Sequence, residues 1–233
     1  MSISLGTKII GDLKSYNTPR KVRYLTEFLQ QKIFEATFVD EQNLRNRNLP
    51  FFDNLEKSVS SFDLVIAFDF GHGLFEGERV QKFTDMNKFK ALNVQTNSNN
   101  FGYNTFNKHS ACDVIVLDER EVRLGLQDRY AGLKELLTNR ATPQNLMMTL
   151  GKRGAMSLNM DTPVPTFIED PIDTTGSGDA FFSVYSVIKY LGYDDEISAF
   201  VGNIHAGLHA KIRGNKQAVS GGQLYNYIKG LIS

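Results

Sequence analysis

The chain has 233 residues, of which 41% are hydrophobic and 22% charged, as is ordinary for a globular protein that buries a core. Basic and acidic residues both number 26, so the formal net charge is zero and a bulk polyanion such as nucleic acid is not an expected partner. The single cysteine, Cys112, excludes an intrachain disulfide and a cysteine zinc site and suits a reducing cytoplasm. No apolar run approaches membrane-spanning length, so no membrane partner is expected.

Short apolar runs alternate with helical patterns along most of the chain. Strands are expected at residues 32–39, 63–68, 114–117, 145–150, 155–158 and 164–167. Helices are expected at residues 76–89 and 129–138. Residues 93–107 contain six asparagines, which favour turns and left-handed backbone, so this stretch is expected to be an ordered loop that could also contact ligand hydroxyls.

Two amphipathic helices are expected near the C-terminus. The first has an apolar face formed by Ala180, Val184, Ile188 and Leu191, and the second by Ile197, Phe200, Val201, Ile204 and Leu208. Strands separated by helices imply an α/β fold in which a mainly parallel sheet is covered on both faces. In such folds ligands bind beyond the carboxyl ends of the strands.

A small-residue loop leads directly into the first of these helices. Gly176, Ser177 and Gly178 have little bulk, so their backbone N–H groups can approach an anion, and the helix N-terminus adds positive potential. Asp179 follows in the first helical turn, where a carboxylate can accept the proton of an attacking hydroxyl. For this piece alone, the alternative is an ordinary turn in which Asp179 complements the helix dipole.

The string Asp-Thr-Thr-Gly-Ser-Gly-Asp-Ala-Phe, which starts at Asp173, resembles the signature of the ribokinase (PfkB) family of carbohydrate kinases. Ser177 replaces the usual alanine. The resemblance implies a ribokinase-like three-layer α/β/α fold, ATP and Mg²⁺ as cofactors, and phosphorylation of a hydroxyl of a sugar or sugar phosphate. It also implies Asp179 as the catalytic base. The loop Gly176, Ser177 and Gly178 would be the anion hole, and Asp173 and Thr174 would lie at the nucleotide.

Two further parts of the sequence, one that begins at Thr149 and one that includes Asn203, are similar to family motifs around the nucleotide. Thr149-Leu-Gly-Lys-Arg-Gly-Ala resembles a turn beside the ATP phosphates and ribose, which implies nucleotide contacts for Thr149, Gly151 and Gly154; a simple hairpin turn is the alternative. Asn203 matches the late helix that borders the adenine pocket, and its alternative is a polar residue on a helix surface.

The run Asp118-Glu-Arg-Glu121 resembles the family's Asn-x-x-Glu motif, with aspartate in the asparagine position. It implies that Asp118 and Glu121 organise Mg²⁺ indirectly, through water. The alternative is a charged helix start, because acidic residues are favourable in a first turn.

The run Asp69-Phe-Gly-His-Gly resembles the Asp-Tyr-Gly-Lys-Gly segment of the heptose-phosphate kinase branch, the kinase part of ADP-heptose synthases. It implies substrate contacts for Asp69, Gly71 and His72, although His72 replaces the lysine. A tight turn enforced by two glycines is the alternative.

The resemblance covers nearly the whole chain but not the whole family domain. We expect residues 1–233 to form one kinase domain without the family's N-terminal strands and part of its lid, with residues 1–40 as lid-return and sheet-entry segment. A sheet that lacks edge strands exposes an edge, which predicts a homo-oligomer or association with a missing upstream domain. The alternative function is a non-catalytic nucleotide-binding or assembly fragment of a larger, bifunctional kinase and nucleotidyltransferase. A heptose phosphate is the favoured acceptor, although sequence does not identify the sugar.

Overall fold

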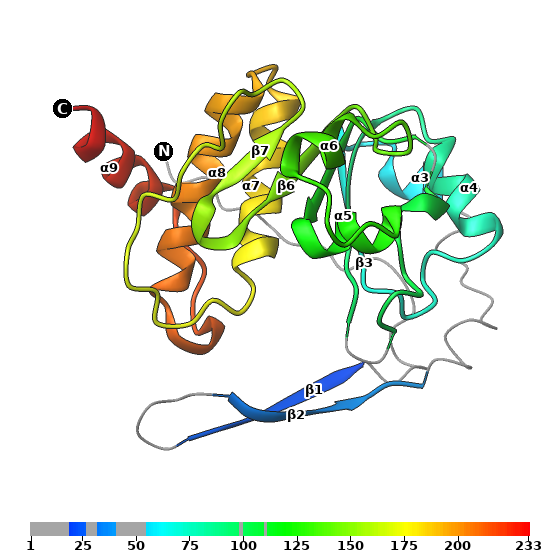
Figure 1. Ribbon diagram of the computed structural model, residues 1–233, viewed down its shortest axis with the longest axis horizontal. Coiled ribbons are helices and arrows are strands. Elements are labelled where there is room, and N and C mark those ends of the chain that lie inside the picture. Colours follow the sequence, from blue (N-terminus) through cyan, green and yellow to red (C-terminus); the bar gives the residue numbers. More distant parts are fainter. Residues whose placement is uncertain (1–18, 27–31, 41–54, 98–99, 110) are drawn as a thin grey trace. The chain divides into compact units, whose positions relative to one another are not determined.

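The computed structural model describes residues 19–26, 32–40, 55–97, 100–109 and 111–233 (Figure 1). They belong to two compact units. The described parts of residues 1–62 and 72–86 form the smaller unit, and residues 63–71 and 87–233 form the larger one. Much of the expected lid-return segment, residues 1–18 and 27–31, lies outside the described residues, so its assignment stays a prediction.

Among the described residues, the smaller unit contains a two-stranded antiparallel ribbon and two short helices. Its elements are β1 (Arg20–Leu25), β2 (Lys32–Phe38), α3 (Leu55–Val59) and α4 (Glu78–Thr84). Tyr24 and Phe34 stack across the ribbon with ring centroids 4.2 Å apart, and Arg23 Nε lies 2.7 Å from Glu35 Oε2. Cross-strand aromatic and ionic pairs of this kind stabilise a ribbon. The strand expected at residues 32–39 is therefore confirmed, while its partner β1 was not predicted.

The larger unit is built on a five-stranded sheet in the order β3-β4-β5-β6-β7. The strands are β3 (Leu64–Asp69), β4 (Phe89–Val94), β5 (Val114–Asp118), β6 (Leu146–Thr149) and β7 (Ala155–Ser157). The first four are mutually parallel, and β7 runs antiparallel to β6. The expected mainly parallel sheet is confirmed.

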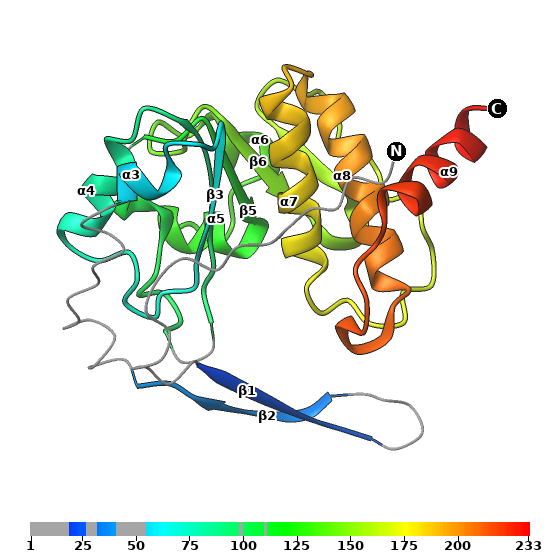
Figure 2. The same ribbon diagram turned by 180° about the vertical axis from the view of Figure 1, so that it is seen from behind.

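Helices cover both faces of this sheet. The helical elements are η1 (Phe106–Lys108), α5 (Glu119–Leu126), α6 (Leu133–Thr138), η2 (Gly151–Arg153), α7 (Ser177–Tyr190), α8 (Asp195–Ala210), η3 (Arg213–Asn215) and α9 (Gly221–Ile232). α5 and α6 lie in front of the sheet in Figure 1, and α7 and α8 lie in front of it in the reverse view of Figure 2. α7 packs on β3, β4 and β5, and α8 packs on β7. The unit is thus a three-layer α/β/α sandwich.

The helix expected at residues 76–89 is wrong in its second half, because α4 ends at Thr84 and β4 begins at Phe89. β4 contains two polar residues, Lys90 and Asn93, that are nevertheless buried, at 8% and 7% exposure. Buried polar side chains interrupted the apolar pattern by which a central strand is recognised.

Two other expectations need correction. The helix expected at residues 129–138 is confined to α6, and the strand expected at residues 164–167 is a single bridge between Val164 and Ala155. A one-residue bridge needs no alternating pattern, because only one residue pair has to meet.

The buried face of α7 differs from the predicted one. Leu191 is exposed, and the residues that are buried besides Ala180 are Phe181, Phe182, Tyr185 and Ser186. α7 contacts both α8 and the sheet, so it buries two surfaces instead of one stripe. On α8, Ile204 is buried as expected, while Ile197 is exposed.

Within the described part of the chain, none of the helices combines the length and the apolar character that crossing a lipid bilayer requires.

A matched pair of glycine substitutions tests the packing of α5. A Cβ at Gly125 would lie 2.2 Å from the buried ring of Phe106, whereas a Cβ at Gly230 in α9 meets no atom within 4 Å. Both positions are helical and gain the same propensity from alanine, at most about 1 kcal/mol. Gly125→Ala should therefore lower the free energy of unfolding by about 1–3 kcal/mol, and Gly230→Ala should leave it unchanged or raise it. Urea denaturation measures both, and equal effects would contradict the packing.

Candidate functional site

Polar residues gather at the carboxyl ends of the four parallel strands. Asp69 ends β3, Gln95 directly follows β4, Asp118 ends β5 and Thr149 ends β6. The N-terminus of α7 brings Asp179 to the same edge, because the Gln95 amide Nε2 donates a hydrogen bond to Asp179 Oδ1 over 2.5 Å. This edge is where ligands bind in folds of this kind.

The glycine loop forms a left-handed turn into α7. Gly176 is the residue that precedes the helix and has φ +79°, a conformation that favours glycine. The Ser177 N–H donates to Thr174 O over 3.1 Å and closes the turn, while Gly178 is exposed. The first N–H groups of a helix have no acceptor within it, so this end can receive an anion. The Ser177 hydroxyl is buried and meets no hydrogen-bonding group among the described residues.

The segment before this loop is held against the end of α8 and η3. Asp173 Oδ1 accepts the Thr175 N–H over 2.9 Å, and Asp173 Oδ2 accepts the Gly214 N–H over 3.0 Å. His209 Nε2 lies 3.1 Å from Thr175 O, which ties the loop to α8. Asp173 therefore shapes the loop with both carboxylate oxygens, while Thr174 is exposed beside it.

Asp118 and Glu121 form a reciprocal cap at the start of α5. The Glu121 N–H donates to Asp118 Oδ1 over 2.7 Å, and the Asp118 N–H donates to Glu121 Oε2 over 2.8 Å. Glu121 Oε1 accepts the Thr96 N–H over 3.2 Å. Burial, the charge of Asp118 and, more weakly, the charge of Asp179 raise the pKa of Glu121 to about 8. Glu121 therefore interacts electrostatically with both Asp118 and Asp179.

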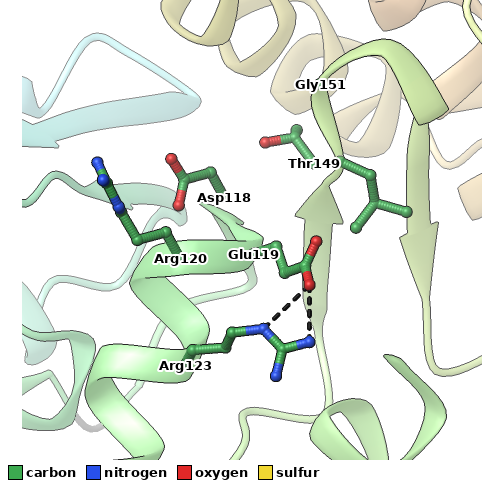
Figure 3. Close-up of a pocket in the computed structure, with 7 residues that line it drawn as sticks. Asp118, Glu119, Arg120, Arg123, Thr149 and Gly151 are labelled. Atoms are coloured by element: carbon green, nitrogen blue, oxygen red, sulfur yellow. Dashed lines mark hydrogen bonds and ion pairs between the residues drawn. The ribbon is translucent and has the colours of Figure 1, made fainter. Parts of the chain in front are cut away.

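A cavity of about 400 Å³ adjoins this cap and is lined by Asp118, Glu119, Arg120, Arg123, Thr149, Leu150 and Gly151. Figure 3 shows the Asp118 carboxylate and the Thr149 hydroxyl at its upper side, while Glu119 turns toward Arg123. Glu119 Oε1 lies 2.7 Å from Arg123 Nη2, and Arg153 pairs with Glu119 Oε2. Although burial opposes ionisation, these two guanidinium groups hold the pKa of Glu119 below its usual value.

The turn after β6 brings two backbone segments close together. Gly154 has φ +92°, and a Cβ there would lie 1.8 Å from Val164 O. The Asn203 amide donates to Val164 O over 2.9 Å and to Pro165 O over 3.0 Å. Both amide protons of this buried asparagine are thereby used to hold the segment that follows Val164 against α8.

The substrate residues expected from the heptose-phosphate kinase resemblance fall into both units. Asp69 and Gly71 belong to the larger unit and His72 to the smaller one. Asp69 is 1% exposed and accepts hydrogen bonds from the Gly71 N–H over 3.0 Å and from Lys108 Nζ over 2.8 Å, and its Oδ2 lies 3.0 Å from His109 Nε2. Because the Asp69 carboxylate is so deeply buried, a direct substrate contact would require the groups around it to move.

Sequence reasoning missed Gln95, Thr96, Lys108 and His109, which connect the site to the asparagine-rich stretch. Their one available signal was position, since Gln95 and Thr96 follow a strand end, but β4 itself was not recognised. Burial raises the pKa of the Cys112 thiol to about 12, which disfavours the nucleophilic thiolate near neutral pH. Within the described ranges, no group of three or more histidine, cysteine, aspartate or glutamate residues is placed to hold a metal directly.

Comparisons with known proteins agree with this geometry. A profile of the pfkB family of carbohydrate kinases matches residues 78–217. No curated protein sequence matches the chain. A ribokinase structure from Thermotoga maritima is 16% identical, with a TM-score of 0.66 over 91% of this chain and 70% of that chain.

Two further structures are similar at the level of the fold. Arabidopsis thaliana ribokinase complexed with ribose and ATP is 14% identical, with a TM-score of 0.66 over 91% of this chain and 69% of that chain. A Burkholderia thailandensis nucleoside kinase in complex with inosine is 15% identical, with a TM-score of 0.63 over 88% of this chain and 65% of that chain. The expected ribokinase-like fold is confirmed, and the chain spans about two thirds of the length of the solved structures it matches.

The opposite pKa shifts of two glutamates on α5 predict opposite pH dependences of stability. The pKa of Glu121 rises from 4.5 to about 8 on folding, so the folded state binds more protons in that window and stability falls as pH rises through it. Glu121→Gln removes this pH-dependent loss of stability. The Tm of the variant relative to the Tm of the parent should therefore increase as pH rises from about 5 to about 8.

Glu119→Gln is the control, because its lowered pKa contributes stability that is present above the unfolded value and lost as pH falls. This variant should be less stable than the parent at neutral pH, and the difference should shrink in acid. Thermal unfolding followed by circular dichroism across the pH range distinguishes the two; identical profiles would contradict the assigned environments.

Proposed function

Because the chain belongs to the pfkB family of carbohydrate kinases, we propose that it transfers the γ-phosphoryl group of ATP to a hydroxyl of a sugar or sugar phosphate. One observation carries the proposal. The Asp179 carboxylate lies in the first turn of a helix that a left-handed glycine loop precedes, at the strand-end edge that also holds Glu121. That combination joins a proton acceptor to an anion-binding helix end.

The cavity beside β5 and β6 suits the phosphates of a nucleotide. Its volume of about 400 Å³ lies within the range of small-molecule sites. Thr149 and Gly151 line it, and Gly154 closes the same turn, where only glycine fits. We assign the remaining nucleotide contacts to Asp173, Thr174 and Asn203, in part through the loop that Asp173 shapes.

Asp118 and Glu121 would hold Mg²⁺ through water. Their oxygens suit a hard cation, and a metal that keeps most of its waters needs only a few protein carboxylates nearby. Burial and, after it, the negative charge of Asp118 raise the pKa of Glu121, and a cation bound nearby would lower it. When bound, Mg²⁺ would neutralise charge on the phosphates.

In the proposed reaction Asp179 accepts the proton of the acceptor hydroxyl. The hydroxyl oxygen forms a bond to the γ-phosphorus as the bond from that phosphorus to the bridging oxygen of ADP breaks, which yields ADP and a phosphate ester. The loop of Gly176, Ser177 and Gly178 stabilises charge on the transferring group through the helix N-terminus, assisted by the buried Ser177 hydroxyl.

We place the acceptor near the β3 end, where Asp69 and Gly71 shape the turn, with His72 as a further candidate contact. The similarity of this run to heptose-phosphate kinases supports a phosphorylated sugar. The structural relatives that bind ribose and inosine support a sugar moiety in general. Among the described strands β3 lies at the edge of the sheet, and such an edge supports association with a second copy of the chain or with a further domain.

Replacing Asp179 tests the proposal. Asp179→Asn keeps the shape but removes the proton acceptor, so sugar-dependent ATP consumption should fall by about 10²–10⁴-fold while nucleotide affinity is retained. Asp161→Asn, an exposed turn position, is the matched control and should be as active as the parent. Turnover is measured with Mg²⁺-ATP and a panel of sugars and sugar phosphates.

Two results would revise the proposal. A parent chain that binds ATP but shows no sugar-dependent turnover favours the non-catalytic nucleotide-binding module. A folded Asp179→Asn variant that no longer binds nucleotide would place Asp179 in binding instead of in proton transfer.

A further inference from the structure

We propose that Gln95 is the positioning residue that orients the Asp179 carboxylate, and that the side chains of Asn97, Asn100 and Asn104 hold Gln95 in place. The inference rests on the proposed function, because it assigns a role toward the proposed base. It starts from the hydrogen bond of 2.5 Å from Gln95 Nε2 to Asp179 Oδ1, which joins residues 84 positions apart in the sequence. This hydrogen bond joins the end of β4 to the first turn of α7.

The backbone of Gln95 is held on both sides. Its N–H donates to Asp69 O over 2.8 Å, which extends the pairing of β4 with β3 by one residue. Its carbonyl accepts from Asn104 Nδ2 over 3.0 Å, and the same amide nitrogen donates to Asp69 O over 3.0 Å. Asn104 thus clips the end of β4 to the end of β3, so the Gln95 side chain starts from a fixed point.

Asn104 is itself locked. It is 4% exposed, and its Oδ1 accepts a hydrogen bond from Lys108 Nζ over 2.7 Å. The same ammonium group lies 2.8 Å from Asp69 Oδ2, and that carboxylate is 1% exposed. A buried polar network in which each member is paired is rigid, because any displacement leaves a desolvated group without its partner.

The backbone at Gly71 also packs tightly against two asparagine side chains at this network. A Cβ at Gly71 would lie 2.2 Å from Asn100 Nδ2 and 2.7 Å from the Asn104 side chain, and Gly71 has φ +69°. Asn100 and Asn97 donate to Phe70 O over 3.0 and 2.8 Å. The amides of Asn97, Asn100 and Asn104 therefore tie their segment to the residues at the end of β3, and the Gln95 amide is the group that reaches Asp179.

An amide is chemically suited to this task. It donates a hydrogen bond to a carboxylate yet neither carries charge nor exchanges a proton near neutral pH. A lysine there would neutralise Asp179, and a carboxylate would compete with it for a proton. Gln95 can fix the carboxylate orientation while Asp179 keeps its capacity as a base.

Several charged or titratable groups face the first turn of α7. Glu121 on α5 interacts electrostatically with Asp179 and with Asp118 at the end of β5, and Asp69, whose carbonyl accepts the Gln95 N–H, pairs with Lys108. From α8, His209 Nε2 lies 3.1 Å from Thr175 O and His205 Nδ1 lies 3.0 Å from Ala180 O. Because all of these stay in place when Gln95 is replaced, a substitution there changes one donor to Asp179.

The decisive variants keep the size of the side chain. Gln95→Met preserves length and volume but removes the donor, and Gln95→Glu replaces the amide by a second carboxylate. Asn107→Ala is the control, because Asn107 belongs to the same loop yet donates to Gly125 O, away from Asp179. Urea denaturation first establishes that all three variants are folded.

The first readout is carboxyl-carbon NMR of the ¹³C-aspartate-labelled chain, in which the Asp179 signal is the one missing from Asp179→Asn. Because a donor to the ionised form favours ionisation, Gln95→Met should move the pH midpoint of this signal up by about one unit. Gln95→Glu should move it further, and Asn107→Ala should not move it. An unmoved midpoint in Gln95→Met would overturn the inference, whether or not the chain is an active kinase.

The second readout is steady-state kinetics on the acceptor that supports turnover. Gln95→Met should lower kcat by about 10–100-fold and leave the KM for ATP unchanged, while Asn107→Ala matches the parent. A fall in ATP affinity with kcat preserved would also overturn the positioning role. An inactive parent chain would count against the proposed function alone, since the NMR titration still decides the role of Gln95.

Discussion

The position of the candidate site depends on how closely α7 packs against its neighbours. α8 presents Ser198, Ala199 and Gly202 as buried small residues, and a Cβ at Gly202 would lie 2.9 Å from the Phe181 ring. On the sheet side, Phe182 packs edge-on against Phe68 of β3 with ring centroids 4.9 Å apart. Because α7 packs closely on both faces, its position is fixed, and its N-terminus lies at the carboxyl ends of the parallel strands.

That placement gathers negative charge, which the structure accommodates with backbone and amide donors. Asp118, Glu121 and Asp179 interact electrostatically, and the N–H groups of Asp118 and Thr96 donate to Glu121. The Gln95 amide donates to Asp179. Neutral donors stabilise the ionised form of a carboxylate without cancelling its charge, as the proposed binding of Mg²⁺ would need. The guanidinium groups nearby, Arg123 and Arg153, are instead engaged by Glu119.

The two sides of the candidate site differ in exposure and in the role that we propose for each. The cavity beside β5 and β6 combines a hydroxyl, a carboxylate and glycine backbone, and in the proposed function it receives the phosphates of a nucleotide together with Mg²⁺. On the side of β3 and β4, the side chains around Asp69 and Asn104 are buried, and they form a hydrogen-bonded network that holds them in place. A kinase needs both, since phosphates must enter and leave while the base keeps its orientation.

The sequence alone determined the fold class, the parallel strands β3, β5 and β6, and the glycine loop with Asp179. These features are local, because they depend on continuous apolar runs or on a single uninterrupted motif. It did not reveal β4, whose buried Lys90 and Asn93 conceal the strand pattern, or the true buried face of α7, which two neighbours define together.

Only the tertiary structure decided which polar residues meet. Gln95 reaches Asp179 across 84 positions of sequence, and Lys108 reaches Asp69 across a strand and a loop. Such pairs leave no periodic trace, because each residue's neighbours along the chain are unrelated to its partner in space. The proposed role of Asp179 as a base could therefore be inferred from its motif, whereas the residues that contact its carboxylate emerged only when parallel strands brought their ends to one edge.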